Sequence, residues 1–325
     1  VLVCPASAEK LEALCKKNRY KTKILCGLKE LVYVSTHKDC NSVMSAIVGS
    51  AALEPTYYAI KAGKKVFLAN KESLIMSGDL LIRAAKKSKS LIIPVDSEHN
   101  SILQILLASG LDYKIGNTRY YEEHIDKISL TASGGPFLNF NLAKLSNVTP
   151  NQATKHPNWR MGKKISVDSA NMMNKVFEVI EACKIFGFSK KKYKIMIHPQ
   201  SYVHSIINFK NGLIKMLLYK PDMKIPISNI LYKSGSQFSK TIKINSKILN
   251  NMDFLQVDKK KFPSINLIKR SLKFNSSITT IINASNEVLV DMFLNKKIAF
   301  LDIVRIVNRI FKDEDFNKYA TSKIS

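Results

Sequence analysis

The chain has 325 residues and is 46% hydrophobic, which is enough to bury one large core or the cores of two to three smaller domains. Its 51 Lys and Arg residues against 25 Asp and Glu residues give a formal net charge of +26. No apolar run approaches the roughly 18 residues that a membrane-spanning helix requires, so no membrane partner is expected.

The first part of the chain alternates strand-like and helix-like segments. Strands are predicted in "NSVMSAIVGSAAL", "VFLAN" and "LIIPV", and helices in "ALEPTYYAIKAGKK", "KESLIMSGDLLIRAAKK" and the segment through "ILQILLASG". Gly63 and Gly110 end two of these helices, since glycine readily takes the left-handed conformation at a helix C-terminus. The alternation predicts an α/β fold with a parallel sheet covered by helices.

Polar residues follow the second of these strands directly. Asn70, Lys71 and Glu72 stand in "LANKESL", just past the aliphatic run. Such a group is typical of a ligand-binding turn, because open α/β sheets hold ligands at the carboxyl ends of their strands. The same residue types also begin helices, and the pattern leaves both interpretations open.

Two carboxylates follow the third strand, in "LIIPVDSEHNSI". In an extended segment alternate side chains share a face, so Asp96 and Glu98 are expected to point the same way and Ser97 the other. The pair suits a hard divalent cation, Mg²⁺ or Mn²⁺. The alternative is that the acids only complement the dipole of the following helix. We assign His99 no role.

The middle of the chain changes character. "KISLTASGGPF" is a predicted strand that breaks into a Ser-Gly-Gly turn, "KHPNWRMGKK" an exposed loop, and "DSANMMNKVFEVIEACKIF" one helix. "YVHSIINFKNGLIKMLLY" predicts a hairpin around Asn211 and Gly212, the dipeptide with the strongest hairpin signal. Mixed pairing of this kind predicts an α+β unit.

The predicted helix after Asp168 has an apolar stripe and a polar arc. The stripe consists of Met172, Val176, Val179, Ile180 and Cys183, and the arc of Asn171, Asn174, Lys175, Glu178 and Glu181. Solvent exposure is the ordinary interpretation of such an arc. The alternative is a site, because a helix that opens at Ser169 has free N–H groups for an anion. Ser169, Asn174 and Lys175 would then bind phosphate, and Glu178 would offer a third carboxylate.

Two loops add weaker candidates. Ser133 and the two glycines after it can expose N–H groups to a phosphate, although the same residues also make an ordinary tight turn. Trp159, the only tryptophan, lies between His156 and Met161 in "HPNWRMG". It either anchors that loop to the core or closes over a ligand.

The remaining features bound the class of protein. Residues 221–263 show weak patterning and are a plausible connection, and the two amphipathic segments after them predict a small helical domain. The five cysteines have no CxxC spacing and indicate free thiols in a reducing compartment. The lysine clusters are short, with only Tyr193 interleaved, which favours solvated lysines over nucleic-acid binding. A basic protein still attracts a phosphorylated substrate.

Together the segments resemble the 1-deoxy-D-xylulose 5-phosphate reductoisomerase family. The matching pieces, in the family's order, are "AIVGSAAL", "LANKESL", "IPVDSEHNSI", "SGGPF", "HPNWRMGKKISVDSANMMNK", "IHPQSYVHS", "PDMKIPI" and "NASNE". The resemblance implies an enzyme that rearranges the phosphorylated sugar 1-deoxy-D-xylulose 5-phosphate. It then reduces the resulting aldehyde with NADPH to 2-C-methyl-D-erythritol 4-phosphate, for non-mevalonate isoprenoid synthesis.

The resemblance also implies an organisation. Residues 1–96 would form a Rossmann-like NADPH-binding domain whose first strand and glycine-rich turn precede Val1. Residues 97–231 would form the α+β catalytic domain, 232–262 a linker and 263–325 a helical domain. It further implies a homodimer in the cytoplasm of a bacterium, an endosymbiont included, or in a plastid-type organelle.

The resemblance assigns roles to residues of this chain. The metal ligands would be Asp96, Glu98 and Glu178, and the catalytic group would add Lys71 and His156. Substrate would be bound by Ser97, Glu98, Ser133, His156, Trp159, Ser169, Asn174, Lys175 and Glu178. NADPH would be bound by Ala46, Ile47, Gly49, Asn70, Lys71, Glu72, Met161 and Gly162, with residues 156–162 as a mobile lid. Two alternatives are a Mg²⁺-dependent sugar-phosphate aldolase or isomerase without reduction, and a nucleic-acid-binding protein on an altered enzyme scaffold.

Overall fold

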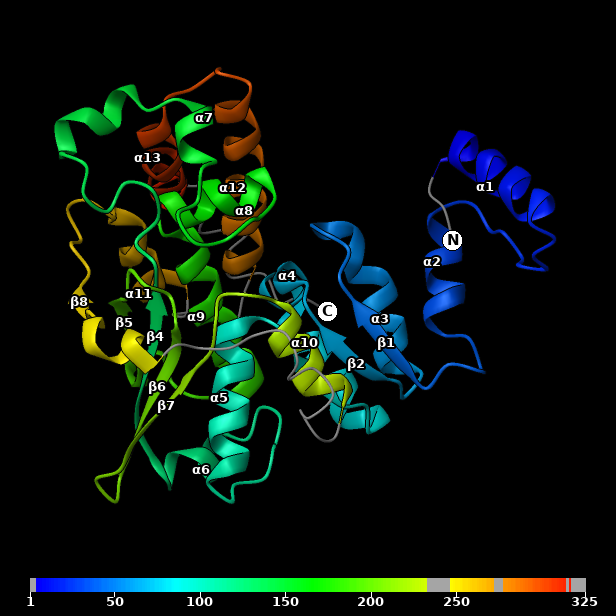
Figure 1. Ribbon diagram of the computed structural model, residues 1–325, viewed down its shortest axis with the longest axis horizontal. Helices are drawn as coiled ribbons and strands as arrows, with labels where there is room; N and C mark the ends of the chain where they lie inside the picture. The colour runs from blue at the N-terminus through cyan, green and yellow to red at the C-terminus, as the bar shows by residue number, and fades with distance from the viewer. Residues whose placement is uncertain (1–3, 233–245, 272–276, 314–315, 317–325) are drawn as a thin grey trace.

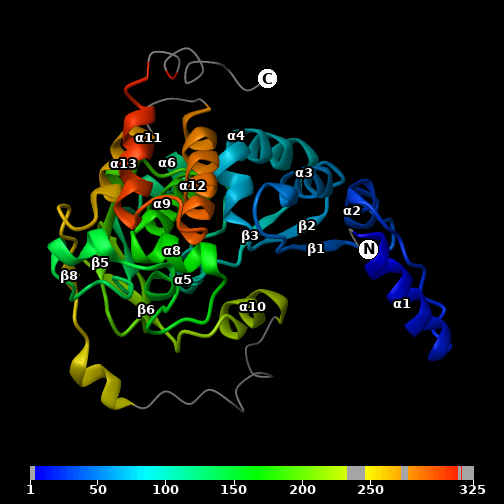
Figure 2. The ribbon, with the colours of Figure 1, turned by 90° about the horizontal axis from the view of Figure 1, so that it is seen from above.

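The computed structural model describes residues 4–232, 246–271, 277–313 and 316 (Figure 1). Its elements form two sheets and a set of helices. Figures 1 and 2 place a parallel sheet to the right of a larger mixed sheet. The N-terminal helices α1 (Pro5–Lys17) and α2 (Leu28–Ser35) lie at the outer end of the parallel side. Within the described ranges, no helix combines the length and apolar character needed to cross a membrane.

The parallel sheet has the strand order β1-β2-β3. Its strands are β1 (Ser42–Ser45), β2 (Lys65–Leu68) and β3 (Ile92–Pro94). Val66 lies in register with Val43 on one side and Ile92 on the other. Helices α3 (Leu53–Lys61) and α4 (Lys71–Ser88) follow the first two strands. The predicted strands and helices of this part are therefore confirmed.

The mixed sheet has the order β7-β6-β4-β5-β8. Its strands are β4 (Ile125–Ala132), β5 (Tyr193–Ile197), β6 (Val203–Phe209), β7 (Ile214–Leu218) and β8 (Leu255–Gln256). Only the pair of β4 and β5 is parallel. The hairpin between β6 and β7 is confirmed, and Gly212 supplies the positive φ of 86° that its turn requires.

One apolar core joins the two sheets. Helices α5 (Ser97–Ala108) and α9 (Met173–Phe186) contribute to it beside α4. Leu68 of β2, Leu74 of α4, Leu130 of β4 and Ile185 of α9 belong to this single buried cluster. The carboxyl ends of β3 and β4 are thereby held close to the start of α9.

A second core belongs to the C-terminal helices. It packs α12 (Ile278–Leu294) and α13 (Phe300–Ile310) against α8 (Lys163–Ala170) and α9. Phe137, Phe293 and Phe300 form edge-to-face pairs within it. Both predicted amphipathic helices are confirmed. The smaller helices are α6 (Thr118–Glu122), α7 (Pro150–Ala153), α10 (Lys224–Leu231), α11 (Leu267–Ser271), η1 (Ser50–Ala52), η2 (Leu142–Asn147), η3 (Lys190–Lys192), η5 (Ser246–Asn251) and η6 (Pro263–Asn266).

The predicted helix from Asp168 is wrong in one respect. The chain forms two helices, α8 and α9, that are separated at Asn171 and Met172, where Met172 has a φ of 64°. The side chain of Asn171 accepts a hydrogen bond from the N–H of Met173 at 2.9 Å, a local bond that competes with helix continuation. Ser169 therefore lies in the last turn of α8 and not at a helix N-terminus.

The strand expectation at Asp96 also needs correction. β3 ends at Pro94, and Ser97 already begins α5, so Asp96 is the N-cap residue and Glu98 lies in the first turn. The alternation of an extended strand does not apply to these acids. Of the predicted linker, residues 233–245 lie outside the described residues, and β8 within the rest adds an edge strand to the mixed sheet. Parts of the predicted C-terminal domain, 272–276, 314–315 and 317–325, also lie outside them.

Candidate active site

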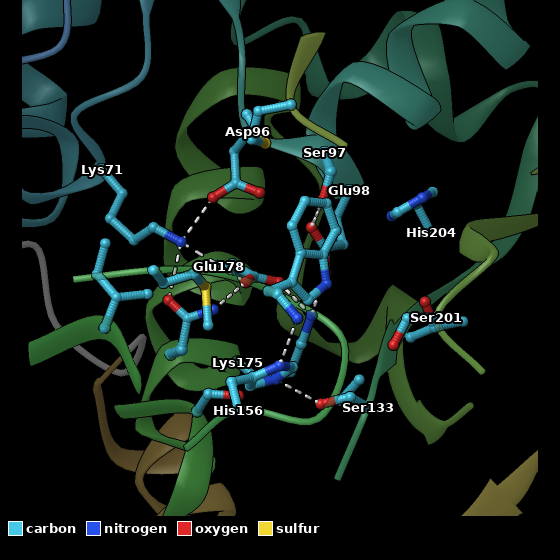
Figure 3. A pocket seen from close by; sticks show the side chains of 18 of the residues that line it. Lys71, Asp96, Ser97, Glu98, Ser133, His156, Lys175, Glu178, Ser201 and His204 are labelled. Carbon is cyan, nitrogen blue, oxygen red and sulfur yellow. Dashed lines mark hydrogen bonds and ion pairs between the residues drawn. The ribbon is translucent and has the colours of Figure 1, made fainter. Parts of the chain in front are cut away.

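A pocket of about 240 Å³ opens between the carboxyl ends of β3 and β4, the loop before α8 and the start of α9 (Figure 3). It collects most of the predicted site residues. Those that line it are Lys71, Asp96, Ser97, Glu98, Ser133, His156, Trp159, Met161, Ser169, Asn174, Lys175 and Glu178.

Three acids from separate segments meet in this pocket. Asp96 and Glu98 come from the start of α5, and Glu178 comes from the second turn of α9. One oxygen of each lies within 4.8 Å of the others. The Ser97 hydroxyl donates to Glu98 Oε2 at 2.5 Å. The polar arc is thus buried except for the half-buried Asn174, with Glu178 at 1% exposure, and its solvent-exposed interpretation is wrong.

Two lysines are interleaved with the acids. Lys71 Nζ lies 2.6 Å from Asp96 Oδ2 and 3.6 Å from Glu178 Oε1. Lys175 Nζ lies 2.6 Å from Glu98 Oε1 and 2.5 Å from Glu178 Oε2. Lys71 also donates to the side-chain oxygen of Asn174 at 2.9 Å. Each ammonium group therefore joins the start of α5 to α9.

The pKa values of Glu178 and Asp96 are shifted in opposite directions. Burial, and then the neighbouring Glu98, raises the pKa of Glu178 to about 8. Burial also acts to raise the pKa of Asp96, but the Lys71 ammonium and His99 outweigh it, so that pKa falls well below its usual value. Three carboxylates forced together in a buried pocket form a donor set of hard oxygens. That set fits a divalent cation such as Mg²⁺ or Mn²⁺.

The loop before α8 reaches the pocket through His156. The N–H groups of Asn158 and Trp159 donate to its Nδ1 at 3.2 and 2.9 Å, so Nε2 carries the proton and donates to the Ser133 hydroxyl at 2.9 Å. Burial, and then the charge of Lys175, lowers the pKa of His156 to about 4. The neutral His156 side chain therefore links this loop to the turn after β4 by hydrogen bonds.

Trp159 fits both sequence interpretations. Its ring packs edge-to-face on the ring of His204 in β6, with the ring centres 6.0 Å apart, and it also lines the pocket. The loop is further held by Asn158, whose amide donates to the Ser201 hydroxyl at 2.8 Å. Trp159 thus anchors its loop to β6 while it covers the cavity.

The turn after β4 presses closely on α8. Gly135 has a φ of 67°, and a Cβ atom there would lie 3.0 Å from both Ala170 Cα and Ser169 O. Only glycine fits this approach without displacing backbone. Ser133 and Ser169 therefore face the same pocket from two segments in direct contact.

Sequence reasoning assigned no role to Ser201 and His204, although both line the pocket (Figure 3). Ser201 has a φ of 57°, and His204 stacks on Tyr219 with ring centres 3.9 Å apart. Alternation along β6 gave no signal for His204, because it occupies an ordinary position of a two-sided strand. The other pocket residues outside the predicted set are Ala69, Thr131, Ala132, Arg160, Ile165, Met172, Val203 and Met223.

The predicted cofactor residues fall into two groups. Met161 and Lys71 line the pocket, whereas the others are not among its lining residues. The Asn70 amide donates to the carbonyls of Ile47 and Gly49 at 2.8 and 3.1 Å, and its side-chain oxygen accepts from the N–H of Ser73 at 2.9 Å. Asn70 thus caps α4 and fixes the turn after β1. The remaining members of this group are Ala46 and Glu72, and Gly162 is the N-cap of α8.

Family models, similar sequences and solved structures all relate this chain to known proteins. The family model "1-deoxy-D-xylulose 5-phosphate reductoisomerase" matches residues 1–78, its C-terminal domain matches 92–186, and "DXP reductoisomerase C-terminal domain" matches 218–324. Reductoisomerases of Acinetobacter baumannii and Saccharophagus degradans are 41% and 42% identical. The alignments cover 94% and 90% of this chain, and 77% and 73% of those proteins.

Solved structures agree with these matches. A DOX-P reductoisomerase in complex with NADPH, fosmidomycin and magnesium superposes with a TM-score of 0.90 at 36% identity, covering 98% of this chain and 78% of that chain. The enzyme from Zymomonas mobilis in complex with NADPH gives a TM-score of 0.85 at 34% identity, covering 100% of this chain and 79% of that one.

Proposed function

Because the chain belongs to the 1-deoxy-D-xylulose 5-phosphate reductoisomerase family, we propose that its pocket converts 1-deoxy-D-xylulose 5-phosphate to 2-C-methyl-D-erythritol 4-phosphate with NADPH. The observation that supports this most is the meeting of Asp96, Glu98 and Glu178 within 4.8 Å beside Lys175. Neither alternative, an aldolase without reduction or a nucleic-acid-binding protein, accounts for matches along the whole chain.

Asp96, Glu98 and Glu178 are the proposed ligands of Mg²⁺ or Mn²⁺. When bound, such an ion polarises a substrate carbonyl and stabilises charge that develops on its oxygen. Burial acts to lower the pKa of Lys71, but Asp96 and Glu178 outweigh it and hold that pKa well above its usual value. Lys71 therefore keeps its proton on Nζ and offers a fixed positive charge to the reacting oxygens.

A second set of polar side chains in the pocket suits the phosphate group. Ser133, Ser169, Asn174 and Lys175 line it, with hydroxyl, amide and ammonium donors from three segments. The remote phosphate provides binding energy that can close residues 156–162 over the substrate. His156 holds Ser133 in place for this contact, and Trp159 excludes water from the reacting carbons.

The nicotinamide is proposed to enter beside Lys71 and Met161. NADPH supplies the hydride when it is bound, so the protein has to place it and shield it. The turn after β1, which holds Ile47 and Gly49 against Asn70, is the proposed edge of the cofactor site. Its position at the carboxyl end of a parallel strand supports that assignment.

The protein is proposed to act as a homodimer through the uncovered face of the mixed sheet. Register places Met216, Ile206, Ser129 and Lys194 in one row on the face opposite the shared core. Met216 is 42% exposed and Ile214 on the same face is 61% exposed, an apolar pattern that suits a second copy of the chain. Its relatives above are bacterial, which supports the bacterial cytoplasm over a plastid-type organelle.

The test of the reaction is direct. Purified protein with 1-deoxy-D-xylulose 5-phosphate and Mn²⁺ should consume NADPH, followed by its absorbance, with one methylerythritol phosphate formed per NADPH. Loss of the sugar phosphate without NADPH consumption would instead indicate an isomerase or aldolase. Tight, salt-sensitive binding to unrelated DNA without turnover would indicate the nucleic-acid alternative.

A further inference from the structure

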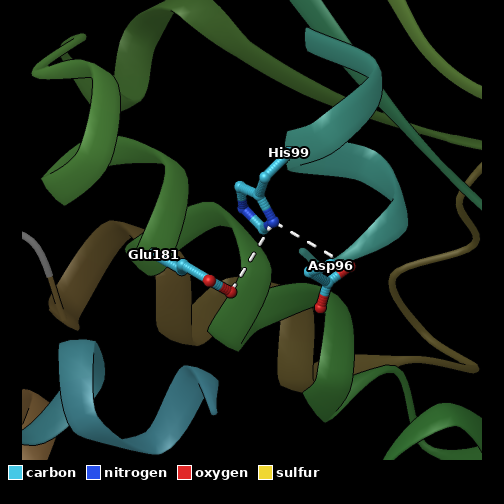
Figure 4. A group of neighbouring side chains, drawn as sticks. All are labelled: Asp96, His99 and Glu181. Carbon is cyan, nitrogen blue, oxygen red and sulfur yellow. Dashed lines mark ion pairs between the residues drawn. The ribbon is translucent and has the colours of Figure 1, made fainter. Parts of the chain in front are cut away.

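A histidine and a fourth acid lie next to Asp96, one of the three carboxylates (Figure 4). His99 is in the first turn of α5, next to Glu98, and Glu181 is on α9, one turn beyond Glu178. Both side chains are completely buried, at 0% exposure. Neither lines the pocket, so neither can touch a ligand bound there.

The His99 ring joins the two helices that carry the acids. Its Nε2 lies 2.8 Å from the backbone oxygen of Glu178, and because a carbonyl only accepts, Nε2 carries a proton and donates it. Its Nδ1 faces the other way, 3.9 Å from Asp96 Oδ1 and 3.6 Å from Glu181 Oε2. A single ring thus contacts the side chain of one proposed ligand and the main chain of another.

Glu181 depends on this ring. In the part of the chain that the structure describes, neither of its carboxylate oxygens has a hydrogen-bond partner. His99 is the side chain with which it forms an ion pair. A buried carboxylate with so little compensation costs free energy, and an apolar side chain would fill the same place in the core at less cost. Packing alone therefore does not account for an acid at this position.

We propose that His99 and Glu181 are positioning residues that hold Asp96 and Glu178 in the geometry of the divalent-metal site. Asp96 Oδ2 is drawn to Lys71 at 2.6 Å, whereas Oδ1 faces the His99 ring. The ring opposes rotation of this carboxylate towards the lysine, and Glu181 fixes the ring from behind. Such outer partners orient the groups that bind a metal directly. The inference rests on the proposed function, since it presupposes that these acids hold an ion.

The experiment measures Mn²⁺ affinity by electron paramagnetic resonance of free Mn²⁺, with no substrate or NADPH present. Glu181→Gln keeps the volume of the side chain and removes its charge. His99→Gln keeps a donor near the Nε2 position but removes the ring that faces Glu181. Each variant should bind Mn²⁺ 10- to 100-fold more weakly, the usual loss on removing an outer partner of a metal ligand. The double variant should bind Mn²⁺ no more weakly than the weaker-binding of the two single variants, because the two residues act as a unit.

Ser101→Ala is the matched control. Ser101 is also buried on α5, and its hydroxyl accepts a hydrogen bond from Ser205 of β6 at 2.7 Å. This variant should unfold more easily and bind Mn²⁺ like the wild type. Glu181→Gln is close to isosteric, so it remains informative if His99→Gln fails to fold.

Four results would overturn an assignment. Affinities of both variants within twofold of the wild type would reject the positioning role, and so would an equal loss in Ser101→Ala. Two Mn²⁺ ions per chain would mean that Asp96, His99 and Glu181 hold an ion themselves, which also rejects it. A wild-type protein that binds no Mn²⁺, with or without substrate, would instead reject the proposed metal site.

Discussion

Lys164 and Glu72 form an ion pair at 3.0 Å between the first turn of α8 and the first turn of α4. Residues 156–162 lead directly into α8, so this pair ties the loop over the pocket to the helix that follows β2. Lys164 also lies 3.4 Å from Asp168, which in turn accepts a hydrogen bond from Asn286 of α12 at 2.8 Å. The parallel sheet, the pocket loop and the C-terminal helices therefore meet at one buried network.

Lys164→Met should lower the free energy of unfolding by about 2 kcal/mol, because it leaves Glu72 and Asp168 buried without their cation. Urea denaturation measures this change. Lys184→Met is the control, since its partner Asp79 is 52% exposed and such a pair contributes at most about 1 kcal/mol. Equal losses in the two variants would contradict the network.

Asp96→Asn should lower kcat/KM about 1000-fold, because loss of a metal ligand removes several kcal/mol of charge stabilisation in the transition state. Glu178→Gln should do the same. The measurement is NADPH consumption at saturating Mn²⁺. Asp79→Asn, which changes an exposed acid on α4, should keep full activity; activity retained in either site variant would refute the ligand assignment.

His204 should make the protein less stable in acid. Burial lowers its pKa to about 4 in the folded protein, although Glu98 acts to raise it, whereas the pKa of a histidine in the unfolded chain is about 6.5. The unfolded state therefore binds more protons between these values, and stability falls as pH drops from 6.5 towards about 4. The difference of 2.5 units corresponds to about 3 kcal/mol. His204→Gln should flatten this part of the stability curve measured in urea, and an unchanged slope would contradict it.

Trp159 should report substrate binding through its fluorescence. It is the only tryptophan of the chain and lines the pocket, so closure over the sugar phosphate changes its surroundings. Adding 1-deoxy-D-xylulose 5-phosphate should shift or quench the emission, and the sugar without phosphate should not. Trp159→Ala should lower kcat/KM about tenfold through loss of an aromatic contact. Trp159 emission that is unchanged on adding the substrate would show that the loop does not close over it.

Met216→Lys should dissociate the proposed homodimer. Met216 lies on the edge strand β7, and a lysine there would bury a charge against the second copy. Light scattering coupled to gel filtration should show a change from twice the chain mass to the chain mass of 36.6 kDa. Lys210→Met, in the hairpin turn, is the control and should leave the mass unchanged. A monomeric wild type would reject the proposal.

Local patterns predicted much of the fold. Aliphatic runs located β2 and β3, and Asn211 with Gly212 located the hairpin, because these signals act within a few residues. The break between α8 and α9 had no such signal. Met172 takes a left-handed conformation that its own side chain disfavours, and the Ser264 hydroxyl, which donates to the Asn171 carbonyl, comes from elsewhere in the fold.

The candidate site shows the same limit. Three acids could be selected from their places after strands and on one helix, but the burial of Lys175, Glu178 and Glu181 could not. On a helical wheel these residues form a polar face that would ordinarily be exposed to solvent. Only the packing of α5 against α9 buries that face. The sequence gives no signal for His99 for the same reason, since its proposed role depends on the groups that stand opposite it.

The contact of Gly135 with the last turn of α8 has a consequence for natural variation. Any side chain there would force Ser133 and Ser169 apart, at the place proposed to grip the phosphate. A cell that carries such an allele would make a strained enzyme that binds the sugar phosphate weakly, so its growth would depend on a raised level of that substrate.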